Sequence, residues 1–426
     1  MKTLLKNAQI VDATSDLNGK KKDILIENGK IVNIGTNLKS DKNTQVVEAD
    51  NLHVSVGWFD MQANFCDPGF EYKETISSGI KAAASGGFTG VSVMPSTHPP
   101  VYSKSQVEYI KNKAKSLSVD VFPIGTISHK LEGKELSEMY DMHLSGAVAF
   151  SDDKKSIADS GLLLRALMYA KNFNGLVLTH CNDDAITIDG QMNESAVGTS
   201  LGLKGIPALA EELMIARNIH LAEYAESKIH ISSVSTEKSV ELIRLAKAKK
   251  IKITASVNAH HLLLNDSVLF DFDTNYKLNP PLRSQKDVEA LKKGLADGTI
   301  DVIVSDHVPE NEENKKTEFD HSAFGMIGLE TAFAIANSTK GNMKLEKLIH
   351  KITVAPRKIL NLEIPNIKVG EKANLTLFNP DLNWTFAEKN IFSKSKNTPF
   401  VGTNFKGKPL GIFNNNLLVM NSDLKK

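Results

Sequence analysis

The chain has 426 residues, of which 41% are hydrophobic, and its 51 basic residues nearly balance 50 acidic ones to give a net charge of +1. A chain of this length can bury a sizeable core, and the near-neutral charge without a basic stripe excludes a general nucleic-acid-binding or anionic-membrane-binding protein. Two cysteines, Cys66 and Cys181, exclude a disulfide framework and a structural zinc knuckle, which fits a reducing compartment.

Targeting signals are not evident in the sequence. The first residues lack a long apolar segment followed by a small-residue cleavage site. No later run approaches the roughly 18 apolar residues that a membrane-spanning helix needs. We therefore expect a cytoplasmic protein with no membrane association.

The two ends of the chain are predicted to form strands. Residues 1–55 contain the short alternating runs LLKNAQIVD, DILIENGKIVNIG and TQVVEADNLHV, separated by Asn-Gly and Gly-Lys turns. Residues 358–426 return to this pattern in KVGEKANLTLFNPDLNWTF and GKPLGIFNNNLLV. We predict that both ends build one small β-sandwich domain.

Residues 56–357 alternate short apolar runs with longer helical segments, such as GLLLRALMYAKNF and TEKSVELIRLAKAKK. The apolar runs are VSVGWFDMQAN, FTGVSVMPS, VDVFPIGT, GAVAFSDD, GLVLTHC, KIHISSVS, KITASVNAHH and DVIVSDHVP. Eight such alternations favour a closed (β/α)8 barrel of the TIM type over an open doubly wound sheet.

Polar residues recur where these apolar runs end. In a barrel, active sites form at the carboxyl ends of the strands, so these residues are the candidates for a functional site. They are Gln62, Asn64, Asp152, Asp153, His180, Ser232, Ser233, His260, His261, Asp306 and His307.

Several long motifs resemble those of the dihydroorotases, the cyclic-amide hydrolases of pyrimidine biosynthesis within the amidohydrolase superfamily. In chain order they are CDPGFEYKETISSGIKAAASGGFTGVSVMPSTHP, GLKGIPALAEELMIARNIHLAE, VSTEKSVELI, AHHLLL, NPPLR, DGTIDVIVSDHVP and FGMIGLETAF. The resemblance covers almost the whole chain and implies the barrel with flanking β segments predicted above.

For active members, the resemblance implies two zinc ions that activate a bridging hydroxide and polarise the amide carbonyl. Three positions keep the expected ligand type, namely Asp153, His180 and Asp306. In active members Asp306 would also be the general base and acid. The other three positions hold Gln62, Asn64 and Ser233, where imidazoles are expected. Amide and hydroxyl oxygens are poor zinc ligands, so the resemblance implies a degenerate metal site.

The resemblance also implies altered substrate contacts. Cys66 stands where an arginine would grip the substrate carboxylate, and Ser96 where an asparagine is expected. Glu310 replaces a histidine and would repel a dicarboxylate. Lys154 and Lys155 follow the strand-four acids, where a glycine is usual, and either bring charge into the pocket or lie on a solvated loop.

Structural interpretations compete with functional ones at several positions. Asp152 and Asp153 fit loop or helix caps, and His230 fits the core. Arg283 fits a structural contact at the barrel mouth, and neither cysteine has a neighbouring base that would make it a nucleophile.

These observations favour a dihydroorotase-like pseudoenzyme with no tightly bound cofactor and at most one weakly held divalent metal. The predicted role is structural or regulatory, in a homodimer and in association with aspartate carbamoyltransferase, for which the family offers precedents. Two alternatives stay open: an active metal-dependent cyclic amidohydrolase with a reduced site that uses Asp153, His180 and Asp306, and a small-molecule binding module.

Overall fold

A computed structural model describes residues 2–424. Within this range eight parallel strands form a barrel in the order β15-β14-β13-β10-β9-β8-β7-β6. They are β6 (Trp58–Ala63), β7 (Phe88–Val93), β8 (Asp120–Gly125), β9 (Ala149–Phe150), β10 (Val177–His180), β13 (Ile229–Ser232), β14 (Ile253–Asn258) and β15 (Val302–Val304). A parallel bridge between Ala63 and His307 joins the last strand to the first and closes the barrel.

Helices surround the barrel, and several of the longer ones bury one apolar face. α7, for example, buries Val240 and Ile243, and Thr236 caps its amino end by accepting a hydrogen bond from the Ser239 amide. The helices between β6 and β15 are α1 (Ile76–Ser85), α2 (Lys104–Ala114), α3 (Met139–Ser145), α4 (Ser160–Lys171), α5 (Ala196–Leu201), α6 (Ala208–Ala225), α7 (Glu237–Ala248) and α8 (Gln285–Asp297). After β15 come α9 (Glu312–Lys315), α10 (Ala332–Thr339), α11 (Leu345–His350) and α12 (Val354–Ile359), and two short strands, β11 (Met192–Asn193) and β12 (Gly205–Ile206), pair beside α5 and α6.

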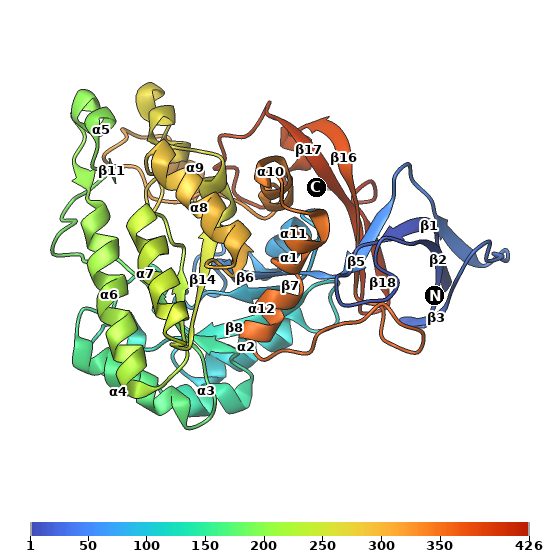
Figure 1. Cartoon of the computed structure of the whole chain (residues 1–426), viewed down its shortest axis with the longest axis horizontal. Coiled ribbons are helices and arrows are strands. Elements are labelled where there is room, and N and C mark those ends of the chain that lie inside the picture. The colour runs from blue at the N-terminus through green and yellow to red at the C-terminus, as the bar shows by residue number, and fades with distance from the viewer. Residues whose placement is uncertain (1, 425–426) are drawn as a thin grey trace.

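The two ends of the chain combine in one β domain, as predicted, and their strands form one mixed sheet. Its order is β18-β17-β16-β5-β1-β2-β3, with β4 beside β1. The strands are β1 (Lys2–Ile10), β2 (Lys21–Glu27), β3 (Lys30–Gly35), β4 (Thr44–Val47), β5 (His53–Val56), β16 (Leu375–Thr385), β17 (Asn404–Asn414) and β18 (Leu417–Met420). Val54 pairs with Leu377, so the sheet joins segments that are far apart in the sequence. Figure 1 shows this sheet at one end of the molecule and α4 and α6 at the other.

The junction between sheet and barrel lies at Gly57. The sequence run VSVGWFDMQAN was interpreted as one strand, whereas the structure divides it into β5, which belongs to the shared sheet, and β6, which opens the barrel. A Cβ at Gly57 would lie 1.9 Å from the Asn374 side chain and 2.0 Å from that of Thr89, so only glycine permits this close approach.

The helices can also be tested against the thickness of a bilayer. Among residues 2–424, none of them combines the length and the apolar character that a membrane crossing requires.

Candidate functional site

The carboxyl ends of the barrel strands bring the predicted polar residues together. We use "barrel mouth" for the cluster of Gln62, Asn64, Asp153, Lys154, His180, Ser233, Asn258 and Asp306. Gln62 lies within β6, His180 ends β10 and Asn258 ends β14. Asp153, Ser233 and Asp306 follow β9, β13 and β15 closely. The order of the strands in the barrel is therefore enough to bring these side chains together.

The backbone turns sharply at three of these strand ends. Asp153, Ser233 and Asp306 have φ values of 54°, 57° and 47°, in the left-handed region that residues other than glycine seldom adopt. Such a conformation costs on the order of 1 kcal/mol for each residue and persists only where the surrounding structure imposes it. The three turns direct these side chains into the barrel mouth.

Asp306 is the centre of the hydrogen-bond network. Its Oδ1 accepts from Gln62 Nε2 at 2.6 Å and from Lys154 Nζ at 2.7 Å. Its Oδ2 accepts from Asn258 Nδ2 at 2.9 Å. Gln62 Nε2 also donates to Ser233 Oγ at 3.0 Å. The carboxylate is therefore held by one ammonium and two amide groups.

Asp153 is held in a similar way. Its Oδ2 accepts from Asn64 Nδ2 at 2.8 Å, and Ser96 also donates to this carboxyl group. Burial raises its pKa above the usual range, although the Lys154 ammonium and the two hydrogen bonds oppose this shift. Gln62 and Asn64 thus act as donors to the two carboxylates, at positions where the family resemblance expected metal-binding imidazoles.

The histidines of the mouth are neutral. Burial lowers the pKa of His180 to about 3, and repulsion from the Lys154 ammonium adds to the effect. Burial and repulsion from the Lys154 ammonium also lower the pKa of His260 to about 3. The pKa of His261 lies well below its usual value, mainly because of burial and secondly because of repulsion from His260. No positive charge at the mouth therefore comes from these imidazoles at neutral pH.

Three buried polar atoms of the barrel mouth have no hydrogen-bond partner within the described part of the chain. They are Asp153 Oδ1, His180 Nε2 and Asn258 Oδ1. Buried polar atoms are normally satisfied, so these atoms leave hydrogen-bonding capacity for an ordered water or a polar ligand.

The three expected substrate positions surround the same mouth but do not form an anion clamp. Cys66 is buried, and burial raises the pKa of its thiol, so it carries no charge at neutral pH. Ser96 is engaged by Asp153. Glu310 Oε1 pairs with Lys73 Nζ at 2.7 Å, which compensates the negative charge that we expected to repel a dicarboxylate.

This donor set does not fit zinc. Two of the six expected ligand positions present amide N–H groups to carboxylates, and a third, Ser233, offers a hydroxyl. The Lys154 ammonium occupies the space beside Asp306 Oδ1 that a cation would need. Within residues 2–424, no group of three or more His, Cys, Asp and Glu side chains is arranged to hold a metal ion.

Asp152 and His230 make structural contacts, although Asp152 holds the earlier loop after β8 and not the loop or helix that follows it. Asp152 accepts from the Ile127 and Ser128 amides at 2.8 and 2.9 Å. His230 is buried in β13, where its Nδ1 lies 2.8 Å from Thr254 Oγ1. These contacts hold the loops and the core and leave no role in chemistry for either residue.

Arg283, at the edge of the mouth, is also structural. Its side chain is buried and donates to Asn193 Oδ1 at 3.0 Å, Ser235 Oγ at 3.1 Å and the Ile206 carbonyl at 2.6 Å. These bonds connect three segments, so its guanidinium is not free to bind a substrate.

Two functional positions were missed. Asn258 was passed over because the end of its apolar run was placed at His260 and His261, although Asn258 is the last residue of β14 and the strand-end rule applies to it. Lys73 was missed because nothing local connects it to Glu310, which lies 237 residues further along the chain.

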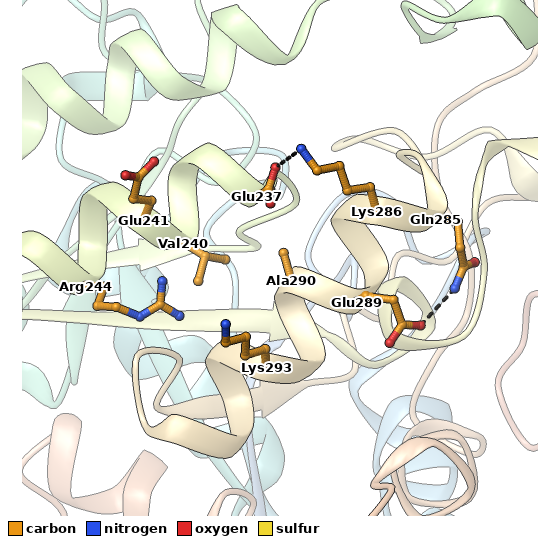
Figure 2. Close-up of a pocket in the computed structure, with 9 residues that line it drawn as sticks. All are labelled: Glu237, Val240, Glu241, Arg244, Gln285, Lys286, Glu289, Ala290 and Lys293. Atoms are coloured by element: carbon orange, nitrogen blue, oxygen red, sulfur yellow. Dashed lines mark hydrogen bonds and ion pairs between the residues drawn. The ribbon is translucent and has the colours of Figure 1, made fainter.

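A cavity of about 770 Å³ lies outside the barrel, between α7 and α8 (Figure 2). Its charges are largely compensated. Glu237 pairs with Lys286 at 2.6 Å and Arg244 with Asp297 at 2.8 Å, and Gln285 donates to Glu289. This charged groove contains none of the strand-end residues and is separate from the barrel mouth.

Solved structures confirm the fold class. L-hydantoinase (dihydropyrimidinase) from Arthrobacter aurescens matches with a TM-score of 0.85 over 98% of this chain and 96% of its own, at 23% identity. Dihydropyrimidinase from Brevibacillus agri matches with a TM-score of 0.83 over 99% and 95%, also at 23% identity. The chain therefore shares the fold of these solved structures.

Sequence relatives are closer. The dihydroorotase of Citrifermentans bemidjiense is 41% identical over 96% of this chain and 97% of its own length, and that of Pelotomaculum thermopropionicum is 43% identical over 96% of both. The model of the family described as dihydro-orotase-like matches residues 53–239. The chain belongs to the dihydroorotase family.

Proposed function

We propose that this protein is a dihydroorotase homologue that has lost hydrolysis and acts through binding. One observation carries the proposal: the ammonium of Lys154 and the amides of Gln62 and Asn64 hold the two carboxylates around which metal ions would have to assemble. Wherever a metal ligand has been replaced, the new side chain serves this network.

The chemistry of amide hydrolysis supports the proposal. The reaction near neutral pH needs a strong nucleophile, and a metal ion supplies one by lowering the pKa of bound water to about 7. Without such an ion, water must be activated by a base alone. Asp306 is poorly suited to that role, because it already accepts three hydrogen bonds, one of them from an ammonium.

Substrate positioning offers separate support. Carbamoyl aspartate and dihydroorotate carry carboxylates, whose binding normally uses an arginine fork. The corresponding position is the buried thiol of Cys66, and the nearby Lys73 is committed to Glu310. Among the described residues, the site therefore lacks both a way to activate water as a nucleophile and a cationic side chain that is free to bind the substrate carboxylate.

A steady-state assay tests the proposal. We expect no measurable interconversion of carbamoyl aspartate and dihydroorotate in either direction, with zinc, manganese or cobalt added. Turnover of order 1 per second, in the usual enzyme range, would overturn the proposal if Asp306→Ala abolishes it. The names of the relatives favour that rival, an active hydrolase, since they are called dihydroorotases at 41% to 43% identity.

Metal analysis of the purified protein provides an independent test. After exposure to zinc and dialysis, we expect fewer than one ion per chain, because only Asp153, His180 and Asp306 keep the ligand type and two of these carboxylates are already engaged. Two tightly held zinc ions per chain would contradict the proposal.

A second candidate function is the binding of a small polar molecule at the barrel mouth. The three unpartnered buried atoms of the mouth favour it, because a bound molecule would satisfy them. Binding to the folded state raises the melting temperature, so a thermal-shift screen of uncharged amides and ureides tests this candidate. No stabilisation by any of them at millimolar concentration would count against it.

The role we propose for the protein is structural or regulatory, as a homodimer and in association with aspartate carbamoyltransferase. Exposed apolar side chains on α6 support a protein contact on that helix, since Leu209, Leu213 and Tyr224 are 51%, 48% and 76% exposed. Co-purification of the two untagged proteins at micromolar concentration tests the association, and separate elution would refute it.

A further inference from the structure

A second cavity lies at the opposite end of the barrel from the mouth. It has a volume of about 470 Å³, within the range of small-molecule sites. Ile229 and Ile253 are the first residues of β13 and β14, and Leu176 directly precedes β10, so this cavity opens at the amino ends of the strands. The length of the barrel core separates it from Asp306.

Six of the twelve residues that line this cavity are apolar. They are Leu176, Ile229, Ile251, Ile253, Ala355 and Ile359. Leu176, Ala355 and Ile359 also pack in one hydrophobic cluster with the interior of the barrel, which makes this lining a fixed part of the core. A ligand that enters the cavity would meet a preformed apolar surface.

Basic side chains surround the apolar lining. Lys228 precedes β13, Lys252 precedes β14, Lys358 lies on α12 and His350 ends α11. Within residues 2–424, the ammonium groups of Lys228 and Lys358 make no hydrogen bond or ion pair, whereas Lys252 donates to the Glu226 carbonyl at 3.2 Å. The cavity therefore has at least two uncompensated positive charges at its edge.

The acidic groups nearby are already neutralised. Asp301 lines the cavity, but its Oδ2 accepts from Lys247 Nζ at 2.6 Å and from the Ala255 amide at 2.8 Å. The carboxylate of Glu226 pairs with Lys171 at 3.2 Å. This arrangement differs from the groove between α7 and α8, where Glu237 of the lining pairs with Lys286 (Figure 2).

The geometry points to a binding site for a small amphipathic anion, with a single carboxylate or phosphate headgroup on an apolar ring or chain. The headgroup would lie between Lys228 and Lys358, and the apolar part would cover the isoleucines. A neutral apolar molecule would gain only the second interaction, and a polar anion such as inorganic phosphate only the first. The site is independent of the chemistry at the barrel mouth.

Isothermal titration calorimetry of the full chain with 2-naphthoate tests the proposal, with neutral 2-naphthamide as the matched ligand. We expect naphthoate to bind with a dissociation constant below about 1 mM and at least about tenfold more tightly than naphthamide. A parallel titration with 2-naphthyl phosphate compares the two headgroups. Failure of both anions to bind, or equal binding of naphthoate and naphthamide, would overturn the proposal.

Variants place the binding in this cavity. The double substitution Lys228→Glu and Lys358→Glu should weaken naphthoate at least about tenfold and leave naphthamide unchanged. Lys104→Glu with Lys134→Glu changes the net charge equally at exposed positions outside the cavity and should have no effect. Should the first variant fold poorly, Ala355→Phe fills the cavity and should abolish binding of both ligands. Unchanged affinity in a folded cavity variant would refute the site.

Discussion

The Lys154 ammonium should be a measurable source of stability, because it is the only cation that contacts Asp306 in the described residues. The two side chains are 23% and 5% exposed, and the pair is 2.7 Å apart. Removing one partner of a buried ion pair costs about 3–5 kcal/mol. Gln62 and Asn258 still donate to Asp306, and water reaches the lysine, so we expect Lys154→Met to lower the free energy of unfolding by about 2 kcal/mol.

Urea and thermal unfolding followed by circular dichroism measure this loss. Lys155→Met is the matched control, since Lys155 is exposed and its ammonium makes no hydrogen bond or ion pair within residues 2–424; it should change stability by less than about 0.5 kcal/mol.

A double-mutant cycle isolates the contact from other effects of the substitution. With Asp306→Asn, the Lys154→Met change should cost at least about 1 kcal/mol less than it does in the unmodified protein. Additive effects within about 0.5 kcal/mol would show that the ammonium does not stabilise Asp306, and would remove the main support for a metal-free mouth.

Three further predictions follow from the same geometry. Restoring histidine at positions 62, 64 and 233 should leave zinc content below one ion per chain while Lys154 is present, and adding Lys154→Gly should raise it, as elemental analysis can show; a rise with Lys154 intact would contradict the blocking role of its ammonium. The pKa of His180 is about 3 in the folded state, below its ordinary value near 6.5, so the unfolded state binds the proton first as the pH falls. As the pH falls from 6 to 3, the contribution of His180 to the free energy of unfolding therefore decreases by about 1.4 kcal/mol per pH unit. His180→Asn should remove this part of the pH dependence of the free energy of unfolding, as acid unfolding can show. Light scattering at micromolar concentration should give twice the chain mass, and a monomer mass would end the homodimer prediction.

The fold was predictable because its signals are local and repeated. Each of the eight apolar runs contains a barrel strand, and the alternating runs at both ends became one shared sheet. The error at Gly57 has a physical reason. An apolar run that crosses a glycine without a turn residue gives no sign that its two halves join different sheets, and the need for glycine arises from the close packing of Asn374 and Thr89.

The sequence could predict which residues belong to the candidate site, but not which contacts they make with one another. The rule of strand ends identified Asp153, His180 and Asp306, because barrel topology alone converges them. It could not decide whether Lys154 faces solvent or Asp306. That choice is made by the tertiary structure around the turn, where Asp153 has a left-handed backbone that the sequence does not signal.

The replacements at the mouth make physical sense as a set. Two carboxylates buried without cations would each be costly, since burial of an unpaired charge is strongly unfavourable. In this structure Gln62 and Lys154 donate hydrogen bonds to Asp306, and Asn64 donates one to Asp153. Random decay of a metal site would leave these carboxylates unpaired and the barrel weakened. Because the new side chains donate to both carboxylates, and leave only Asp153 Oδ1 without a partner in the described part of the chain, we propose that the mouth was remodelled to stay folded without metal rather than merely stripped of its ligands.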